Sequence, residues 1–343
     1  MARWLIGTGW TRRLVAKSRS APIDGRTLDE QLAAMLGLDD LDNHSDLRGL
    51  SPTAARVRVA EGIEVAQAPF AGDVEVEALT LAGAAGAIAA RKYTPAGLAA
   101  ASPGVLYIHG GGFVTCDLDT HDPLCRLIAV NAGARVVSID YRLAPEHPFP
   151  AAADDAVAAF RDVAARAGAL GIDRARIAVA GDSAGGHLTA IVALETRGDR
   201  IRPALQVPVY PALDATCSLP SHLALAERYF LTRPMCDWYY DAYLGEDPEL
   251  RRTPRASPLL APSFSGLPPA LVYTSGFDPL RDEGMRYAER LREAGVPVRA
   301  HCFDQLLHGF LLMTALSRAA LDATLRVATE IGEALHHGTG TRR

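Results

Sequence analysis

The stretch GDSAG, residues 181–185, follows the apolar run IAVA at 177–180 and opens into an alanine-rich segment. The apolar run predicts a buried β-strand, and the alanine-rich segment predicts a helix. A G-x-S-x-G sequence between a strand and a helix is typical of a nucleophile elbow, a tight turn that exposes the serine hydroxyl above the sheet. The flanking residues must be small because bulkier side chains would clash with the reversing chain. The stretch therefore predicts Ser183 as a nucleophile at a helix N-terminus, which favours developing negative charge.

A second glycine-rich turn, HGGGF at residues 109–113, follows the apolar run 105–108. Consecutive glycines let backbone N–H groups point toward one place, where side chains would obstruct them. Loops of the HGGG type supply part of the oxyanion hole in esterases. A tight turn without a ligand is the alternative, but the elbow in the same chain argues against it. We expect the oxyanion donors to be the N–H groups of Gly111, Gly112 and Ala184.

A serine nucleophile needs a base, and the base needs an acid that orients it. When the serine stands on such an elbow, the acid and then the base follow downstream, each on a loop after a strand. Asp278 follows the strand predicted over 270–274, and the proline after it suits the first position of a helix. His308 follows the strand predicted over 298–303 and has a glycine beside it. The pattern predicts a triad of Ser183, His308 and Asp278.

Other acids and histidines fit these roles less well. Asp282 falls in the first turn of a predicted helix, where a carboxylate compensates the helix dipole. His187 lies one helical turn after the serine and is expected to point away from the reacting centre. We expect His109 to shape the glycine loop by hydrogen bonding, and Asp182 to stabilise the turn rather than to catalyse.

Further blocks accompany the elbow in a fixed order: HGGGF at 109–113, IDYRLAPEHPFPAA at 139–152, FDPLRDEG at 277–284 and HGF at 308–310. In these blocks the chain resembles the hormone-sensitive-lipase-like (family IV) serine esterases, over about residues 107–310. The resemblance implies an α/β-hydrolase fold, with a mostly parallel eight-stranded sheet flanked by helices and a helical cap. It assigns the nucleophile to Ser183, the acid to Asp278, the base to His308, and the oxyanion glycines to Gly111 and Gly112.

The resemblance also implies an activity. We expect a carboxylesterase that hydrolyses short- to medium-chain acyl esters through an acyl-enzyme, with no metal and no organic cofactor. The triad does not choose the leaving group, so an amide, a lactone or an acylated small molecule remains an alternative substrate. Relatives of the family also serve as small-molecule receptors with a disabled triad, but the three triad residues present here argue against that. Family members are often dimers, which leaves a homodimer open.

The order of predicted elements indicates how the chain is organised. Alternating residues over 74–79 predict a half-exposed strand, with 86–93 as its hairpin partner. From residue 105 onward, predicted strands and helices alternate, as in a mostly parallel sheet covered on both faces. Helices are expected at about 121–132, 151–168, 184–197, 280–294 and 316–336. The resulting division is an N-terminal cap segment at 1–70, core at 71–211, a cap insertion at 212–262 and core again at 263–343.

The cap insertion carries a cluster of aromatic side chains. The spacing of Tyr239 and Tyr243 suits one face of a helix. As a group, the aromatics predict an apolar roof and a substrate with apolar acyl or alcohol parts. We expect Phe113, Trp238 and Tyr239 to contact the substrate, with plain packing of cap against core as the alternative for any single ring. The cluster consists of Tyr229, Phe230, Trp238, Tyr239, Tyr240 and Tyr243.

Composition excludes several other classes of protein. The 343 residues suffice for a large core, and α/β folds of this length often form one domain with an insertion. The net charge of −5 comes without a basic face, which argues against nucleic-acid binding. The five cysteines are scattered and form no C-x-x-C pair, so neither a metal site nor a disulfide framework is expected.

No apolar run approaches the length of a membrane span. Residues 1–16 mix aromatic and apolar residues with arginine, and they lack the long apolar stretch and the small-residue cleavage site of a signal peptide. We therefore expect a cytoplasmic location, with contact between this segment and a membrane surface as the alternative.

Overall fold

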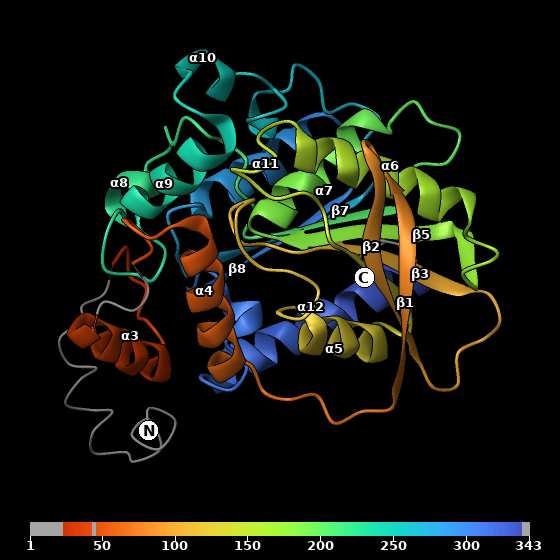
Figure 1. Ribbon diagram of the computed structural model, residues 1–343, viewed down its shortest axis with the longest axis horizontal. Helices are drawn as coiled ribbons and strands as arrows, with labels where there is room; N and C mark the ends of the chain where they lie inside the picture. Colours follow the sequence, from red (N-terminus) through yellow and green to blue (C-terminus); the bar gives the residue numbers. More distant parts are fainter. Residues whose placement is uncertain (1–22, 43–45, 338–343) are drawn as a thin grey trace.

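One eight-stranded sheet forms the centre of the computed structural model, which describes residues 23–42 and 46–337 (Figure 1). The strands lie in the order β1-β2-β4-β3-β5-β6-β7-β8. The pairs at the β1 edge, β1 with β2 and β2 with β4, are antiparallel, and all other pairs are parallel. The expected mostly parallel eight-stranded sheet is thus confirmed. Its strands are β1 (Val74–Gly83), β2 (Gly86–Pro95), β3 (Ser102–Ile108), β4 (Arg135–Ile139), β5 (Ile172–Asp182), β6 (Leu205–Val209), β7 (Ala270–Phe277) and β8 (Val298–Leu307).

Helices cover both faces of this sheet (Figure 1). One face carries α5 (Asp122–Ala132) and α12 (Arg318–His337). The other carries α6 (Ala151–Ala165), α7 (Ala184–Glu195) and α11 (Arg281–Glu293). All five helices were expected from the sequence. The end of α6 differs most from its expected position, because the helix ends at Ala165, three residues before the expected residue 168. In the described ranges, no helix combines the length and apolar character needed to cross a membrane.

The central strands are buried on both faces, so their sequences are almost continuously apolar. In β3, Leu106 and Ile108 join the hydrophobic cluster that includes α6 and α7. Their neighbours Val105 and Tyr107 join the cluster that includes α5 and α12. The alternation of strand side chains between the two faces therefore divides the core into two layers.

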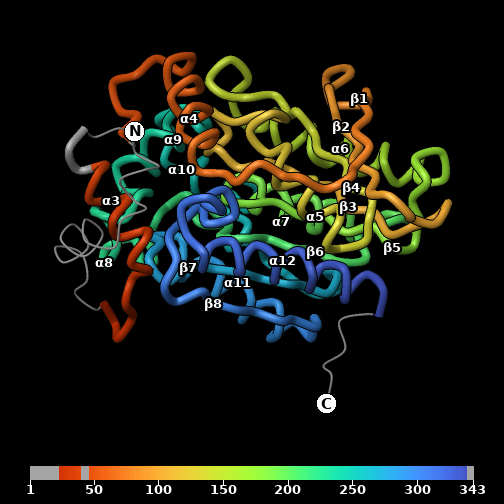
Figure 2. The backbone as a smooth tube through the Cα atoms, turned by 90° about the horizontal axis from the view of Figure 1, so that it is seen from below, coloured from red at the N-terminus to blue at the C-terminus, as the bar shows by residue number. Residues whose placement is uncertain are grey.

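Two segments far apart in the sequence form the cap. The first contributes α3 (Glu30–Asp42) and α4 (Pro52–Ala66). The second contributes α8 (Ser221–Ala224), α9 (Arg233–Leu244) and α10 (Pro248–Arg251). Figures 1 and 2 show all five helices at the same end of the molecule. Of the expected cap segment 1–70, residues 1–22 and 43–45 lie outside the described residues, and so does the segment 1–16 considered for membrane contact.

The N-terminal helices are attached to the C-terminal part of the core. The N–H of Asp29 donates to the carbonyl oxygen of Gln305 at 3.0 Å. After α4, the N–H of Ala68 donates to Thr314 Oγ1 at 2.9 Å, and the N–H of Ala315 donates to the carbonyl of Ala66 at 2.9 Å. The first cap segment is therefore held by Gln305 of β8 and by residues that follow β8.

Candidate active site

Ser183 stands on a strained turn between β5 and α7. Its backbone has φ 54° and ψ −117°, a left-handed conformation that a non-glycine residue adopts at an energetic cost. The turn is so tight that a Cβ atom on Gly185 would lie 1.9 Å from the carbonyl oxygen of Ile108. A Cβ on Gly181 would lie 2.5 Å from the same oxygen. Gly185 is therefore required by the contact between α7 and β3, and Gly181 by the close approach of β5 to β3.

This contact predicts a large loss of stability for Gly185→Ala. Because the obstructing atom belongs to the backbone of a central strand, it cannot move aside without separating β3 from α7. We expect the free energy of unfolding to fall by about 4 kcal/mol or more, as measured by urea denaturation. Gly198→Ala is the control, since a Cβ there meets no atom within 4 Å. Equal stability of the two variants would contradict the proposed steric requirement.

Three side chains from separate loops form one hydrogen-bonded chain. His308 Nε2 lies 2.9 Å from Ser183 Oγ, and His308 Nδ1 lies 2.8 Å from Asp278 Oδ2. The other carboxylate oxygen of Asp278 accepts the N–H of Leu280 at 2.8 Å. Asp278 is fully buried, and His308 is 6% exposed. With the Asp278 carboxylate accepting from Nδ1–H, the free Nε2 can accept the proton of the serine hydroxyl.

Sequence reasoning passed over Tyr210, which packs against this histidine. Its ring centroid lies 4.8 Å from that of His308, and it makes an edge contact with Phe310 at 5.1 Å. Tyr210 directly follows β6 and is completely buried, at a positive φ of 34°. Nothing in the sequence distinguishes Tyr210 from the tyrosines of the core, because its contact with His308 depends on how the loop that carries His308 packs over it.

The glycine loop borders the same cavity as the serine. Gly111 and Gly112 have φ values of 100° and 60°, which glycine adopts without strain. The carbonyl of Gly111 accepts the N–H groups of Val114 and Thr115, which closes the loop. Among the described residues, the Gly111 and Gly112 amides donate to no other group. Gly111 and Gly112 line one cavity together with Ser183 and Ala184.

A buried carboxylate fixes the glycine loop relative to the elbow. Asp182 Oδ1 accepts the Tyr107 hydroxyl at 2.9 Å and the N–H of Gly110 at 3.1 Å. The same oxygen lies 3.2 Å from His121 Nε2. Burial alone would raise the pKa of Asp182, but His121 and the Tyr107 hydroxyl hold it below its usual range. Asp182 thus has the structural place expected of it, with no contact to the imidazole of His308 among the described residues.

The weaker candidates lie in other surroundings. His187 is buried, and its two ring nitrogens lie 2.9 Å and 3.1 Å from the carbonyl oxygens of Ala212 and Arg255. Burial lowers its pKa to about 4, so it is neutral at physiological pH. Asp282 accepts the backbone N–H of Ser221 at 2.9 Å and does not reach His308. His109, as expected, bonds within the glycine loop, with Nδ1 2.8 Å from the Gly110 carbonyl.

Ser183 and His308 open into a cavity of about 530 Å³. Its walls are mostly apolar, and both cap segments contribute to them. From the first segment, α4 provides Val59 and Ile63, and from the second, α9 provides Met235. Ser183 and His308 thus border a pocket whose lining suits the apolar part of a small molecule.

The three residues expected to contact substrate differ in their placement. Tyr239 lines the cavity and packs on the glycine loop, since a Cβ on Gly112 would lie 2.1 Å from its ring. Phe113 also borders the cavity, but its ring is buried and stacks on Tyr243 at 3.9 Å. Trp238 is not among the lining residues of this cavity and packs edge-on against Tyr239 at 5.0 Å. Successive residues of a helix point about 100° apart, so these neighbours on α9 cannot share one face.

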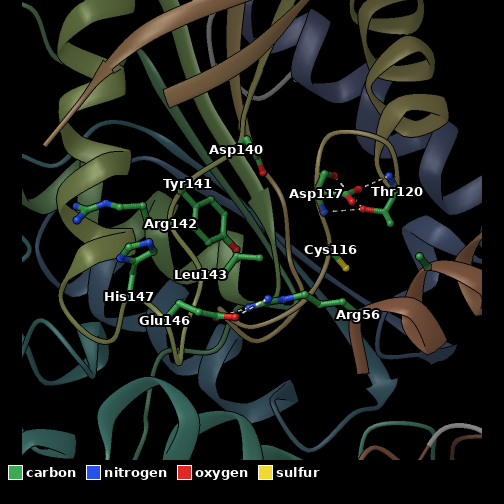
Figure 3. Close-up of a pocket in the computed structure, with 11 residues that line it drawn as sticks. Arg56, Cys116, Asp117, Thr120, Asp140, Tyr141, Arg142, Leu143, Glu146 and His147 are labelled. Atoms are coloured by element: carbon green, nitrogen blue, oxygen red, sulfur yellow. Dashed lines mark hydrogen bonds and ion pairs between the residues drawn. The ribbon is translucent and has the colours of Figure 1, made fainter. Parts of the chain in front are cut away.

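A second, more polar cavity of about 540 Å³ adjoins the first at Cys116 (Figure 3). Arg56 of α4 crosses it and pairs with Glu146 through two hydrogen bonds of 2.8 Å and 2.6 Å. Its guanidinium also donates to the carbonyl oxygens of Val114 and Ala144, at 2.8 Å and 3.0 Å. Arg56 therefore ties the first cap segment to the end of the glycine loop. Other polar side chains around this cavity belong to Asp117, Asp140, Arg142 and His147.

Comparison with known proteins gives a consistent result. Residues 105–312 match the model of a family described as alpha/beta hydrolase fold. The chain is 42% identical to the carboxylic ester hydrolase LipN of Mycobacterium tuberculosis, over 91% of this chain and 85% of that protein. It is 43% identical to carboxylesterase NlhH of the same species, over 73% of this chain and 79% of that protein.

Solved structures of similar proteins share the architecture. An ester hydrolase from the metagenome of Lake Arreo, in complex with a bipyridine phosphonate derivative, has a TM-score of 0.87 at 41% identity. That similarity covers 90% of this chain and all of the other. A hyperthermophilic esterase of Pyrobaculum calidifontis has a TM-score of 0.78 at 37% identity, covering 86% of this chain and 97% of the other.

Proposed function

We propose that this chain, which belongs to the alpha/beta hydrolase fold family, cleaves esters with a Ser183–His308–Asp278 triad. Like its relatives, the chain is a carboxylic ester hydrolase. The observation that carries the proposal is the hydrogen-bonded chain of these three residues, which ends at the base of an apolar cavity. The presence of Gly111 and Gly112 in the lining of the same cavity supports it.

In the first step, Ser183 Oγ attacks the ester carbonyl while His308 Nε2 takes the hydroxyl proton. Asp278 keeps the imidazole in the tautomer with a proton on Nδ1 and stabilises its positive form. The N–H groups of Gly111, Gly112 and Ala184 are the proposed donors to the oxyanion, where removing one such donor costs roughly 10²–10³ in rate. His308 then protonates the leaving alcohol, which leaves an acyl ester on the serine.

In the second step, His308 removes a proton from a water molecule as it attacks the acyl-enzyme. The tetrahedral intermediate uses the same three amides, and its collapse returns the proton to Ser183 Oγ and releases the carboxylic acid. No proton or electron is left over in the cycle, so the side chains of the triad and one water molecule are sufficient for the reaction.

The cavity supports substrates with short to medium acyl chains. Its volume of about 530 Å³ is that of a pocket for a small molecule, and its lining is mostly apolar. The triad does not discriminate between leaving groups, so amides, lactones and acylated small molecules are the second candidates. The receptor alternative is disfavoured because the serine and the imidazole keep the 2.9 Å contact that proton transfer requires.

The test is a series of p-nitrophenyl esters, from acetate to laurate, assayed at equal protein concentration. We expect the highest kcat/KM between acetate and octanoate, whose acyl chains the apolar lining can cover, and a decline toward laurate. A sharp preference for laurate would instead indicate a lipase. An absence of turnover on every ester, with the protein folded, would contradict ester hydrolysis and favour the amide or lactone alternatives.

A further inference from the structure

A buried acid–base pair joins the cap to the core beside the proposed triad acid. Glu283 lies in the first turn of α11, five residues after Asp278, and is fully buried. Its Oε1 lies 2.5 Å from Nε2 of His222, which is also fully buried. Its Oε2 accepts the N–H groups of Leu213 and Asp214, the latter at 2.7 Å. One core carboxylate thus receives three donors from the cap insertion.

The residue before His222 makes further contacts with the same turn. The N–H of Ser221 donates to Asp282 Oδ2 at 2.9 Å, and the Ser221 hydroxyl donates to the carbonyl of Pro279 at 2.6 Å. The N–H of Asp282 returns a longer bond of 3.3 Å to that hydroxyl. Ser221 and His222, at the start of α8, therefore contact three residues of the turn 278–283. We call these contacts the cap clamp.

The cap clamp affects Asp278 because the turn 278–283 orients the Asp278 carboxylate. One carboxylate oxygen accepts the N–H of Leu280 from within the turn, and the other reaches His308. A misplacement of about 1 Å at a reacting group can cost on the order of 10²-fold in rate. Movement of the turn would consequently displace the acid from the imidazole.

We propose that Glu283 and His222 are positioning residues, which hold the turn carrying Asp278 against the cap and so couple the cap to the triad. This inference rests on the proposed function, in which Asp278 is the acid. A buried ion pair is weak evidence for a purely stabilising role, since well-packed apolar residues often stabilise a core as well or better. The placement of this pair beside the acid accounts for its presence.

Neighbouring groups shift the pKa values of both residues of the buried pair. Burial alone would lower the pKa of His222, but the Cys217 thiol and the Glu283 carboxylate raise it to about 10. Burial raises the pKa of Glu283, while His222 opposes that rise. The Glu283 carboxylate thus favours the charged form of His222. The other titratable groups of the cluster are Asp214, Cys236 and Tyr240.

The raised pKa of His222 gives the clamp a defined pH dependence. A histidine whose pKa in the fold exceeds the ordinary 6.5 contributes stability fully below pH 6.5 and loses it as the pH rises through about 10. We expect thermal unfolding of the wild type to show this loss, and that of His222→Gln to lack it.

The decisive experiment measures kcat, KM and the pH profile of Glu283→Gln with p-nitrophenyl butyrate. Glutamine keeps the size of the side chain but lacks the charge that holds His222. We expect kcat to fall by about 10- to 100-fold with KM changed less than about threefold. The acidic limb of the kcat/KM profile should move to lower pH, because a displaced carboxylate stabilises the imidazolium less.

A matched control separates positioning from general stability. Asp155→Asn also removes a fully buried paired carboxylate, the partner of Arg142 at 2.7 Å, but at a distance from the proposed acid. We expect it to lower the melting temperature without moving the pH profile. If Glu283→Gln likewise changes only stability, the positioning role is wrong. Should Glu283→Gln fail to fold, Ser221→Ala, which removes the hydroxyl bond to Pro279, is tested instead by the same two measurements, the melting temperature and the pH profile.

A double-mutant cycle distinguishes failure of this inference from failure of the proposed function. If Glu283 acts through Asp278, adding Glu283→Gln to Asp278→Asn lowers kcat by less than threefold. Additive losses would overturn the coupling and leave the triad proposal intact. An Asp278→Asn variant with unchanged turnover would instead overturn the proposed function itself.

Discussion

Ser183→Ala is expected to lower the turnover of p-nitrophenyl butyrate by at least about 10⁴-fold and to leave the protein folded. Alanine removes the oxygen that attacks the carbonyl, while the amides of the proposed oxyanion hole remain. Its Cβ occupies the position of the serine Cβ at the same φ of 54°, so the turn accommodates it as well as before. The measurements are kcat and the thermal unfolding midpoint.

The control for this substitution is Ser138→Ala, at a buried serine of β4 whose hydroxyl makes no hydrogen bond within the described ranges. We expect wild-type turnover from that variant. A serine-directed phosphonate should label the wild type and Ser138→Ala but not Ser183→Ala. Turnover above about 1% of wild type in Ser183→Ala would refute the assignment of the nucleophile, since a lost nucleophile costs orders of magnitude more.

The second large effect is expected at Asp278. In Asp278→Asn the side-chain amide can donate to Nδ1 of His308. That bond favours the tautomer in which Nε2 carries the proton, and a protonated Nε2 cannot accept the proton of the Ser183 hydroxyl. The substitution also removes the charged acceptor of the 2.8 Å bond to His308, at a fully buried position. We expect kcat to fall by about 10⁴-fold with little change in KM, measured near neutral pH.

Asp282→Asn is the comparison for this variant, because Asp282 is the other acid that the sequence offers. Its carboxylate contacts Ser221 in the cap clamp and does not reach the imidazole. We expect a loss of less than about tenfold there. A greater loss at Asp282 than at Asp278 would show that the acid has been assigned to the wrong residue.

The sequence predicts the meeting of Ser183, Asp278 and His308 for a physical reason. Each follows an apolar run that is recognisable as a strand, and the carboxyl ends of parallel strands meet at one edge of a sheet. The glycines of the elbow and of the HGGGF loop are also recognisable, because only glycine tolerates the close approaches and positive φ values found there. Local sequence patterns therefore predict both the sheet and the proximity of the three residues.

Other parts of the candidate site depend on packing between distant segments. His222 and Glu283 are 61 residues apart, and an acid in the first turn of a helix is expected for the helix dipole alone. Arg56 is 58 residues from its acceptor Val114, with no pattern to connect them. The choice of Tyr239 over Trp238 as the residue facing the cavity depends on the rotation of α9 about its axis, which the sequence alone does not determine.

The attachment of the first cap segment has a consequence for biosynthesis. Ala68 and its hydrogen-bond acceptor Thr314 are 246 residues apart. At roughly 5–20 residues per second, a ribosome needs about 12–50 s to synthesise the intervening chain. During that interval the C-terminal end of α4 lacks its attachment to Thr314 and Ala315. We expect nascent chains stalled before residue 305 to bind chaperones through this helix, and to release them once the last strand and helix have emerged.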